Sequence, residues 1–382
     1  MFGQVPHKSL LIPHQFLSLW PIFGDLTCGI DHAFGVLSML RVSQISASFA
    51  SFAPTQSALV LAVATATVAL AACFASTTAS ATTTFRLAHA SSDDSLINKA
   101  VMRFADEVKQ NTHGDITIKV YPAEQLGDEA AIAEGVGNGS IDIGLGGAVD
   151  AIDPRLNAVS LPFMFKDTTA VHHFLDSPDG KAFLAMGKSR GYVMLGALDS
   201  GFRQFADSKH AIKAPADLAG MKIRTPPNPV ILATMKQLGA LPQSLPLGTV
   251  YTSLQSGVVD GVEPELRDYY DQKWYEVAKY LSMSNYNWSA NYWYMNSDDY
   301  KQLSPADRVA MDKAVTDTVA WYRAELDATY ADVNAKLKTH GVQINTVDTA
   351  PFRAMVAPVY TQFGKTWGVD FVTKLKAEAN AQ

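Results

Sequence analysis

Short apolar segments alternate with amphipathic helical segments from about residue 84 onward, and this alternation restricts the possible folds more than any other pattern in the chain. Residues 84–90 (TFRLAHA) and 116–122 (ITIKVYP) have the character of strands, and Ile97, Val101 and Phe104 recur between them at helical spacing. A strand, a helix and a second strand in this order form a β-α-β unit with parallel strands. The sequence therefore predicts an α/β fold with a largely parallel sheet, whose ligand crevices lie at the carboxyl ends of the strands.

A long helix is predicted near the C-terminus. Ser304 suits the N-cap position and Pro305 the first helical position. Apolar residues then follow at intervals of three or four until Gly341. A helix of roughly 35 residues would be about 50 Å long, which is enough to run across more than one domain.

Composition and motif content exclude several classes of protein. The chain has 382 residues, 48% of them hydrophobic, which is enough for a core in two domains. The chain has 31 Lys and Arg residues and 37 Asp and Glu residues, and its basic residues do not form a stripe along the sequence. This distribution of charge argues against nucleic-acid binding. The sequence contains no P-loop, nucleophile-elbow or H-E-x-x-H motif and no histidines or cysteines at metal-ligand spacing. We therefore expect no cofactor and no metal.

Residues 1–81 have the features of a leader and signal region. Residues 57–72 are uncharged and apolar over the length of a secretory signal, and they are shorter than the roughly 20 residues of a membrane span. Cleavage after Ala81 is favoured, whereas the LAAC sequence that ends at Cys73 would make this cysteine a lipidated N-terminus. Translation is expected to begin at Met39. The predicted location is the periplasm, with lipoprotein anchoring through Cys73 as the alternative.

The segment GMKIRTPPNP, residues 220–229, places Arg224 at the end of a predicted strand and follows it with three prolines. An arginine at a strand end is most often solvated or ion-paired. A guanidinium group also presents a planar fork, which binds a carboxylate through two hydrogen bonds when both partners are held in place. Because the prolines restrict the backbone after Arg224, they would hold this fork in one orientation, and Arg224 is a candidate anion ligand.

Several motifs occur in the order and spacing of one known family. In chain order they are FRLAHASSDD, YPAEQLGDE, GNGSIDIG, SLPFMF, GFRQFADSKHAIKAPADLAGMKIRTP and LQSGVVDGVEPE. From about residue 84 to 375 the chain thereby resembles the solute-binding proteins of tripartite ATP-independent periplasmic (TRAP) transporters, in their dicarboxylate-binding (DctP-type) branch. The resemblance implies a periplasmic-binding-protein-like fold, in which hinge strands and a long spanning helix join two α/β domains.

The same resemblance implies domain boundaries, a role and partners. We expect domain I in residues 82–202 with about 290–328, and domain II in residues 203–289 with about 329–382. The expected role is that of an extracytoplasmic solute-binding component, which captures a small organic anion without converting it and delivers it to the TRAP membrane permease subunits. A monomer is expected.

The resemblance also assigns roles to residues of this chain. The arginine of the KIR motif binds the substrate carboxylate in the family, which gives this role to Arg224. Arg203 is implied as a second ligand contact, with an interdomain salt bridge as the alternative. Glu263 stands where the family carries a glutamate that pairs with an arginine or accepts hydroxyl protons. Pro264 replaces the asparagine that often follows it, so an amide contact is lost at the polar end of the ligand.

Five further residues are weaker candidates for ligand contact. His89 follows the first strand, where the family has a ligand-facing loop, and a structural hydrogen bond is the alternative role. Gln125 and Glu129 are the first and last residues of the QLGDE motif, and Glu129 could instead interact with a helix dipole. Tyr269 and Trp288 belong to an aromatic cluster that could cover a sugar-like ligand, although such clusters mostly form core.

Two questions stay open at the level of the sequence. The ligand is either a C4-dicarboxylate, with Arg203 binding a second carboxylate, or a sugar acid such as a uronate or aldonate. The alternative class of function is a secreted α/β enzyme, a lyase or hydrolase that acts on a carboxylate substrate with Glu263 or His89 as its base.

Overall fold

The computed structural model describes residues 82–380. The predicted signal segment, both processing sites and the start at Met39 lie outside this range. The described residues belong to one compact unit, so the boundaries between domains I and II remain predictions.

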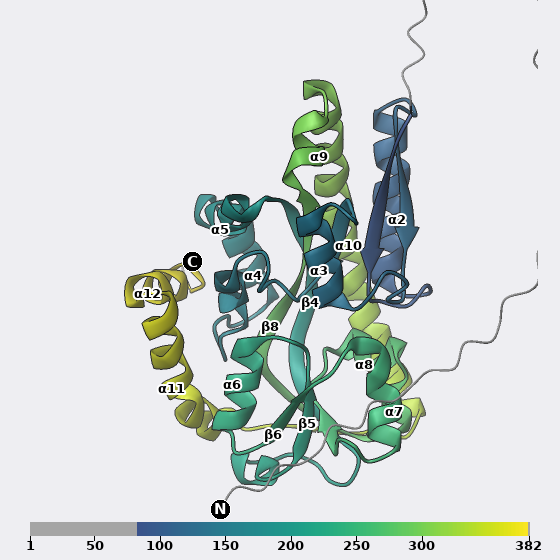
Figure 1. The fold of residues 1–382 in the computed structure, drawn as a ribbon. Coiled ribbons are helices and arrows are strands. Elements are labelled where there is room, and N and C mark those ends of the chain that lie inside the picture. Colours follow the sequence, from purple (N-terminus) through teal and green to yellow (C-terminus); the bar gives the residue numbers. More distant parts are fainter. Residues whose placement is uncertain (1–81, 381–382) are drawn as a thin grey trace, which may run out of the picture. The chain divides into compact units, whose positions relative to one another are not determined.

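A mixed sheet of nine strands forms the centre of the described part of the chain (Figure 1). The strands are β1 (Thr83–His89), β2 (Ile116–Tyr121), β3 (Ile143–Gly146), β4 (Tyr192–Asp207), β5 (Lys222–Thr225), β6 (Leu241–Ser244), β7 (Gly261–Val262), β8 (Tyr280–Asn296) and β9 (Gln343–Thr346). Their order in the sheet is β2-β1-β3-β8-β4-β7-β5-β6, and β9 pairs with β8. The predicted strands at 84–90 and 116–122 are confirmed, and they pair in parallel as expected for a β-α-β unit.

The prediction of a largely parallel sheet is wrong at the centre of the sheet. The long strands β4 and β8 pair antiparallel with each other, and β8 also pairs antiparallel with β3. Parallel pairing holds for β1 with β2 and β3, and for β5 with β6 and β7. Local β-α-β units determine only the pairing within each group of short strands. The two long strands join these groups, and their direction depends on pairing between distant residues.

Helices cover the sheet and connect its strands (Figure 1). The α-helices are α2 (Leu96–Asn111), α3 (Glu129–Asn138), α4 (Thr168–Asp176), α5 (Pro178–Leu184), α6 (Pro229–Gln237), α7 (Val250–Gln255), α8 (Leu266–Asp271), α9 (Ser297–Gln302), α10 (Pro305–Thr339), α11 (Ala350–Trp367) and α12 (Val369–Glu378). Short 3-10 helices are η1 (Pro154–Ser160), η2 (Ala185–Arg190), η3 (Pro215–Leu218), η4 (Leu247–Thr249) and η5 (Trp274–Glu276).

The long helix α10 begins and ends as the sequence predicts. The Ser304 hydroxyl accepts a hydrogen bond from the Asp307 backbone N–H at 3.1 Å, and Pro305 is the first helical residue. In its first half, Met311 and Val315 pack into a core cluster with β1 and α2. In its last turns, Val333 and Leu337 pack into a different cluster around α7 and α8. The helix therefore links two separate cores, which explains its length.

Strand β4 carries irregular pairing close to its middle. Its register against β8 shifts between Asp199 and Gly201 and again between Arg203 and Phe205. Gly201 has a φ of 115°, a conformation that residues with a side chain rarely adopt. Shifts of this kind bend a strand and redirect its side chains.

Candidate functional site

A cavity of about 230 Å³ lies among residues from both groups of short strands and from the two long strands. One wall comes from the chain after β2 and the start of α3, including Glu124 and Glu129. The opposite wall comes from the end of β5, where Arg224 is followed by Pro226 and Pro227. Strands β4 and β8 supply residues between these walls, among them Arg203. Only this folded arrangement brings together side chains that are far apart in the sequence.

Arg224 is the cation of this cavity that lacks a carboxylate partner. It is 3% exposed, and its Nε and one terminal nitrogen donate to the Leu245 carbonyl at 3.0 and 2.8 Å. Within residues 82–380, its other terminal nitrogen has no acceptor and no carboxylate forms an ion pair with it. Burial and the nearby positive charge of Arg203 lower the pKa of Arg224 to about 10. The group remains charged at neutral pH, and a bound anion would offset both unfavourable effects.

The backbone that positions Arg224 agrees with the sequence prediction. Strand β5 ends at Thr225, and Asn228 caps the following helix by accepting from the Val230 and Ile231 N–H groups at 2.9 and 3.1 Å. Pro229 takes the first position of α6. The segment after Arg224 is therefore restricted by its prolines and anchored by a helix cap.

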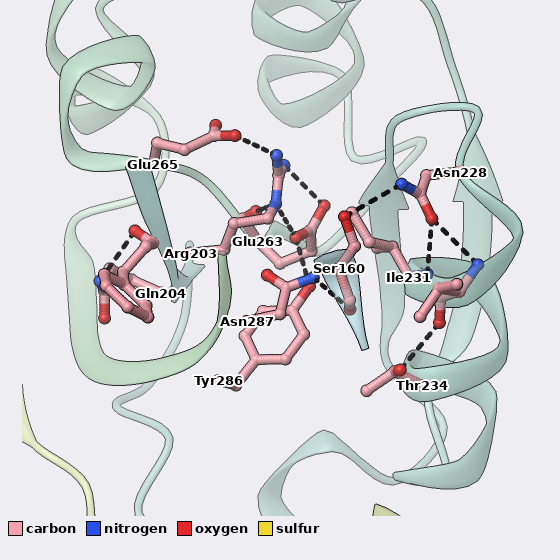
Figure 2. A network of polar contacts seen from close by, with 12 residues as sticks. Ser160, Arg203, Gln204, Asn228, Ile231, Thr234, Glu263, Glu265, Tyr286 and Asn287 are labelled. Atoms are coloured by element: carbon pink, nitrogen blue, oxygen red, sulfur yellow. Dashed lines mark hydrogen bonds and ion pairs between the residues drawn. The ribbon is translucent and has the colours of Figure 1, made fainter. Parts of the chain in front are cut away.

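Arg203 is the second arginine of the cavity, and each of its three guanidinium nitrogens already donates to a carboxylate (Figure 2). Its guanidinium group donates to both carboxylate oxygens of Glu263, with Nη2 to Oε1 at 2.8 Å, and to the carboxylate of Glu265. Tyr286 donates its hydroxyl to the same Glu263 carboxylate. Burial opposes the charge of Arg203, but the two glutamates outweigh this effect and raise its pKa. The contacts of Arg203 are those of a residue in a salt bridge, which is the alternative role that the sequence leaves open for it. Arg203 also lines the cavity.

The cavity also holds carboxyl groups with altered proton affinity. Burial raises the pKa of Glu129 from 4.5 to about 7, an effect that a Gly147 backbone hydrogen bond and Arg224 partly oppose. Burial likewise raises the pKa of Glu265 to about 7, against the attraction of Arg203. Asp268, another lining residue, lies 2.8 Å from a terminal nitrogen of Arg267. The site therefore contains both an unpaired cation and groups that exchange protons near neutral pH.

Of the eight residues named from the sequence, Arg224, Arg203 and Glu129 line the cavity. The other five lie outside its lining. Glu263 is fully buried between Arg203 and Tyr286, where it serves the ion pair. Gln125 is exposed on the chain that precedes α3.

The remaining three are buried and engaged elsewhere. His89 contacts the Asn98 side-chain oxygen through Nε2 at 3.1 Å, and burial lowers its pKa to about 4, so the ring is neutral. Tyr269 donates its hydroxyl to the Ala278 carbonyl within the core around α7 and α8. Trp288 packs edge-to-face on Phe165. Each of the three residues is at most 1% exposed, and none of them lines the cavity.

Several lining residues were missed by the sequence analysis. They are polar residues and include Asn157, Ser289, Asn291 and Glu265. Glu265 is the last residue of the motif LQSGVVDGVEPE. Its negative charge is the signal that could have indicated a pairing with Arg203. Nothing in the local sequence distinguishes the other three from ordinary surface residues.

Residues 82–380 contain no group of three or more histidine, cysteine, aspartate or glutamate side chains that could hold a metal ion. In the same part of the chain, every helix is too short or too polar to cross a membrane. The cavity lining itself offers an anchored guanidinium group, several carboxyl groups, and neutral amides and hydroxyls.

Comparison with known proteins identifies the family. Residues 87–366 match the family described as bacterial extracellular solute-binding protein, family 7. The chain is similar to the crystal structure of a TRAP periplasmic solute-binding protein from Xanthobacter autotrophicus with bound β-D-galacturonate, at 34% identity and a TM-score of 0.74, covering 77% of this chain and 99% of that chain. A TRAP solute-binding protein from Sulfurospirillum deleyianum with bound succinate has 29% identity and a TM-score of 0.73, covering 77% and 98%. The 2,3-diketo-L-gulonate-binding periplasmic protein YiaO of Escherichia coli is 29% identical over 273 residues, which are 71% of this chain and 83% of that protein.

These findings confirm the predicted α/β fold of the periplasmic-binding-protein type and the non-enzymatic class of function. His89 and Glu263, the two bases named for the enzyme alternative, both lie outside the cavity lining and are engaged by protein contacts. The chain belongs to family 7 of the bacterial extracellular solute-binding proteins, the periplasmic solute-binding components of TRAP transporters.

Proposed function

We propose that this protein captures a small organic acid in the cavity, with Arg224 as the residue that binds the ligand carboxylate. The observation that carries the proposal is the buried guanidinium group of Arg224, which is fixed by the Leu245 carbonyl and has no carboxylate partner among the described residues. A charged group in this state favours an anion, because the anion restores the interaction energy that burial removes.

The charges of the cavity favour a ligand with one carboxylate and several hydroxyls. A C4-dicarboxylate needs a second free cation, but the lining arginine Arg203 is neutralised by Glu263 and Glu265. Hydroxyl groups, in contrast, can donate to the carboxyl groups of Glu124 and Glu129. Relatives are described with galacturonate and with 2,3-diketo-L-gulonate, which are sugar acids, and also with succinate. We therefore place a sugar acid ahead of a dicarboxylate.

The ligand would hold the two walls of the cavity together. Arg224 belongs to β5, and Glu129 begins α3, on the opposite wall. A solute that contacts both residues binds more tightly to a closed form than to an open one, and it shifts the population toward closure by this difference in affinity. The closed protein would then deliver its solute to the TRAP permease subunits in the membrane.

The remaining assignments of location follow from the family and from the sequence of the leader. Relatives are periplasmic proteins. We propose that export uses the apolar segment of residues 57–72 and cleavage after Ala81, with lipidation at Cys73 as the alternative. Mass spectrometry of the secreted protein distinguishes the two, because only lipidation leaves Cys73 as a modified N-terminal residue.

A thermal-shift screen tests the proposed function. A ligand that binds only the folded state raises the melting temperature by mass action, so we expect a saturable shift with D-galacturonate, D-galactonate or a related sugar acid. Succinate and malate represent the dicarboxylates, and the bound acid is afterwards recovered and identified. Chemical conversion of the acid, or the absence of a shift with every organic acid after removal of co-purified ligand, would contradict the proposal.

A further inference from the structure

The ring of Trp274 lies against the guanidinium group of Arg224. The Cζ atom of Arg224 is over the Trp274 ring, 5.8 Å from its centroid. Both residues are buried, with 3% of Arg224 and 1% of Trp274 exposed. A cation is attracted to the face of an aromatic ring, most strongly with tryptophan and where water is excluded. Trp274 itself does not line the cavity, so its contact is with the arginine and not with the ligand.

Trp274 has a fixed position of its own. It is the first residue of η5, and its carbonyl accepts hydrogen bonds from the Val277 and Ala278 N–H groups at 3.1 and 2.9 Å. Its side chain belongs to the core cluster around α7 and α8. The indole N–H has no acceptor among the described residues. The ring therefore meets Arg224 through its face, from a place that packing in the core determines.

The Leu245 carbonyl holds one edge of the same guanidinium group. Nε and Nη2 of Arg224 both donate to this oxygen. The Leu245 N–H donates in turn to the Thr225 carbonyl at the end of β5, at 3.2 Å. The ring thus restrains the flat face of the guanidinium group, and the carbonyl restrains one of its edges. The other terminal nitrogen, which has no acceptor within residues 82–380, is left for an anion.

The support of Arg224 differs in kind from that of Arg203. The carboxylates of Glu263 and Glu265 offset the burial of Arg203, but they also occupy its donors. An aromatic face offsets part of the cost of burying a cation without accepting its N–H groups, because these lie in the plane of the guanidinium group. Arg224 is therefore buried and held without a partner that competes with a ligand carboxylate.

On the basis of the proposed function, we propose that Trp274 is a positioning residue for ligand capture, which holds the guanidinium plane of Arg224 in the orientation that binds the ligand carboxylate. A fork that is already oriented loses less freedom when the ligand arrives, so the affinity for a carboxylate depends on the ring. Because Trp274 acts only through Arg224, its effect on affinity disappears when the guanidinium group is absent.

Titration calorimetry with D-galacturonate, D-galactonate and succinate tests the proposal. Trp274→Phe keeps a face that attracts a cation less strongly, and Trp274→Leu removes the face. Trp321→Phe is the matched control, because Trp321 makes the same kind of contact with Arg103, at 5.5 Å, and lies outside the cavity lining. Each variant is also combined with Arg224→Lys, since lysine has no planar group to orient. Circular dichroism and thermal unfolding verify each fold, and Trp274→Phe decides if Trp274→Leu does not fold.

We expect Trp274→Phe to weaken the binding of the acids about threefold to tenfold, Trp274→Leu to weaken it further, and Trp321→Phe to leave it unchanged. In the Arg224→Lys background, the Trp274 replacements should change affinity less than about twofold, because the two positions are coupled. Wild-type affinity in both Trp274 variants would overturn the proposal. Equal weakening in both backgrounds would also overturn it, since it would show a general effect on the cavity wall, and the proposed function would stand.

Nuclear magnetic resonance measures the orientation of Arg224 directly. The Nε–H signal of Arg224 is identified by its absence in the Arg224→Lys variant, and its order parameter reports motion of the group on the picosecond to nanosecond timescale. We expect an ordered group in the wild type and lower order in the Trp274 variants. Unchanged order would overturn the proposal, even where the lysine background binds too weakly to titrate. Failure of all three acids to bind the wild-type protein would instead contradict the proposed function, and with it the positioning role.

Discussion

Arg203 and Glu263 form a buried ion pair, in which both carboxylate oxygens of the glutamate accept hydrogen bonds from the guanidinium group. Arg224 lines the same cavity and, among residues 82–380, donates only to the Leu245 backbone carbonyl. The two arginines therefore differ in what surrounds them rather than in their distance from the site. The first stabilises the fold of the cavity wall, and the second is available to an anion.

Replacing Arg224 with lysine tests its role as the anion ligand. The Arg224→Lys variant keeps the positive charge but loses the planar fork and its two contacts to Leu245. We expect ligand affinity to fall by about 2–4 kcal/mol, as for truncation of a buried charged pair, and the loss is measured by titration calorimetry. Arg103→Lys, on the exposed surface of α2, is the matched control. Unchanged affinity in Arg224→Lys would exclude the assigned role.

Removing Arg203 should affect stability before it affects binding. The Arg203→Met variant leaves the carboxylates of Glu263 and Glu265 buried without their cation. We expect the free energy of unfolding to fall by about 3–5 kcal/mol, measured by urea denaturation. Adding Glu263→Gln to this variant should restore part of the loss, since one uncompensated charge is removed. A change below about 1 kcal/mol in the single variant would show that the pair contributes little.

Glu129 should make stability fall as the pH rises through neutrality. Burial raises its pKa from 4.5 to about 7 in the folded protein, so the native state holds a proton that the unfolded chain has already lost. The contribution to stability is therefore present at low pH and is lost as the pH rises from about 4.5 to 7. The Glu129→Gln variant should be more stable than the wild type at pH 8 and differ less at pH 5. Melting temperatures measure this, with the exposed Glu134→Gln of the same helix as the control.

The same group should connect ligand affinity to pH. A carboxylate bound to Arg224 adds negative charge near Glu129 and raises the pKa of its carboxyl group further. Binding then takes up protons, and affinity should weaken between pH 6 and pH 8, by at most about tenfold per pH unit for one proton. Calorimetry in buffers of different ionisation enthalpy counts the protons. An equal proton count in the wild type and in Glu129→Gln would assign the uptake to another group.

Gly201 should not tolerate a side chain. Its φ of 115° disfavours any other residue, and an added Cβ would lie 1.9 Å from the Tyr330 hydroxyl oxygen. Gly201→Ala should lower the free energy of unfolding by about 1–3 kcal/mol through strain and overpacking. The additional replacement Tyr330→Phe removes the nearest atom, so the double variant should recover stability in part. Full stability of Gly201→Ala in urea denaturation would show that the bend in β4 adapts freely.

Local sequence signals predict local structure well in this protein. Ser304 and Pro305 determine the start of α10 through short-range capping, and the pattern of residues 84–122 determines a β-α-β unit. The antiparallel pairing of β4 with β8 was not predictable in the same way, because it depends on contacts between residues such as Leu198 and Asn291. The cavity shows the same division: Arg224 lies in a sequence motif, whereas Asn157 and Ser289 line the cavity only because the fold brings them together.

The place of β8 in the sheet determines when the cavity can form. β8 lies between β3 and β4, although it follows both of them in the chain, and it also supplies cavity residues such as Ser289. The earlier strands therefore cannot complete the sheet until residues 280–296 have been synthesised and inserted between them. Pairings over such long sequence separations form slowly, because distant segments must first meet. We therefore expect ligand binding to recover late in refolding, when this strand has been inserted.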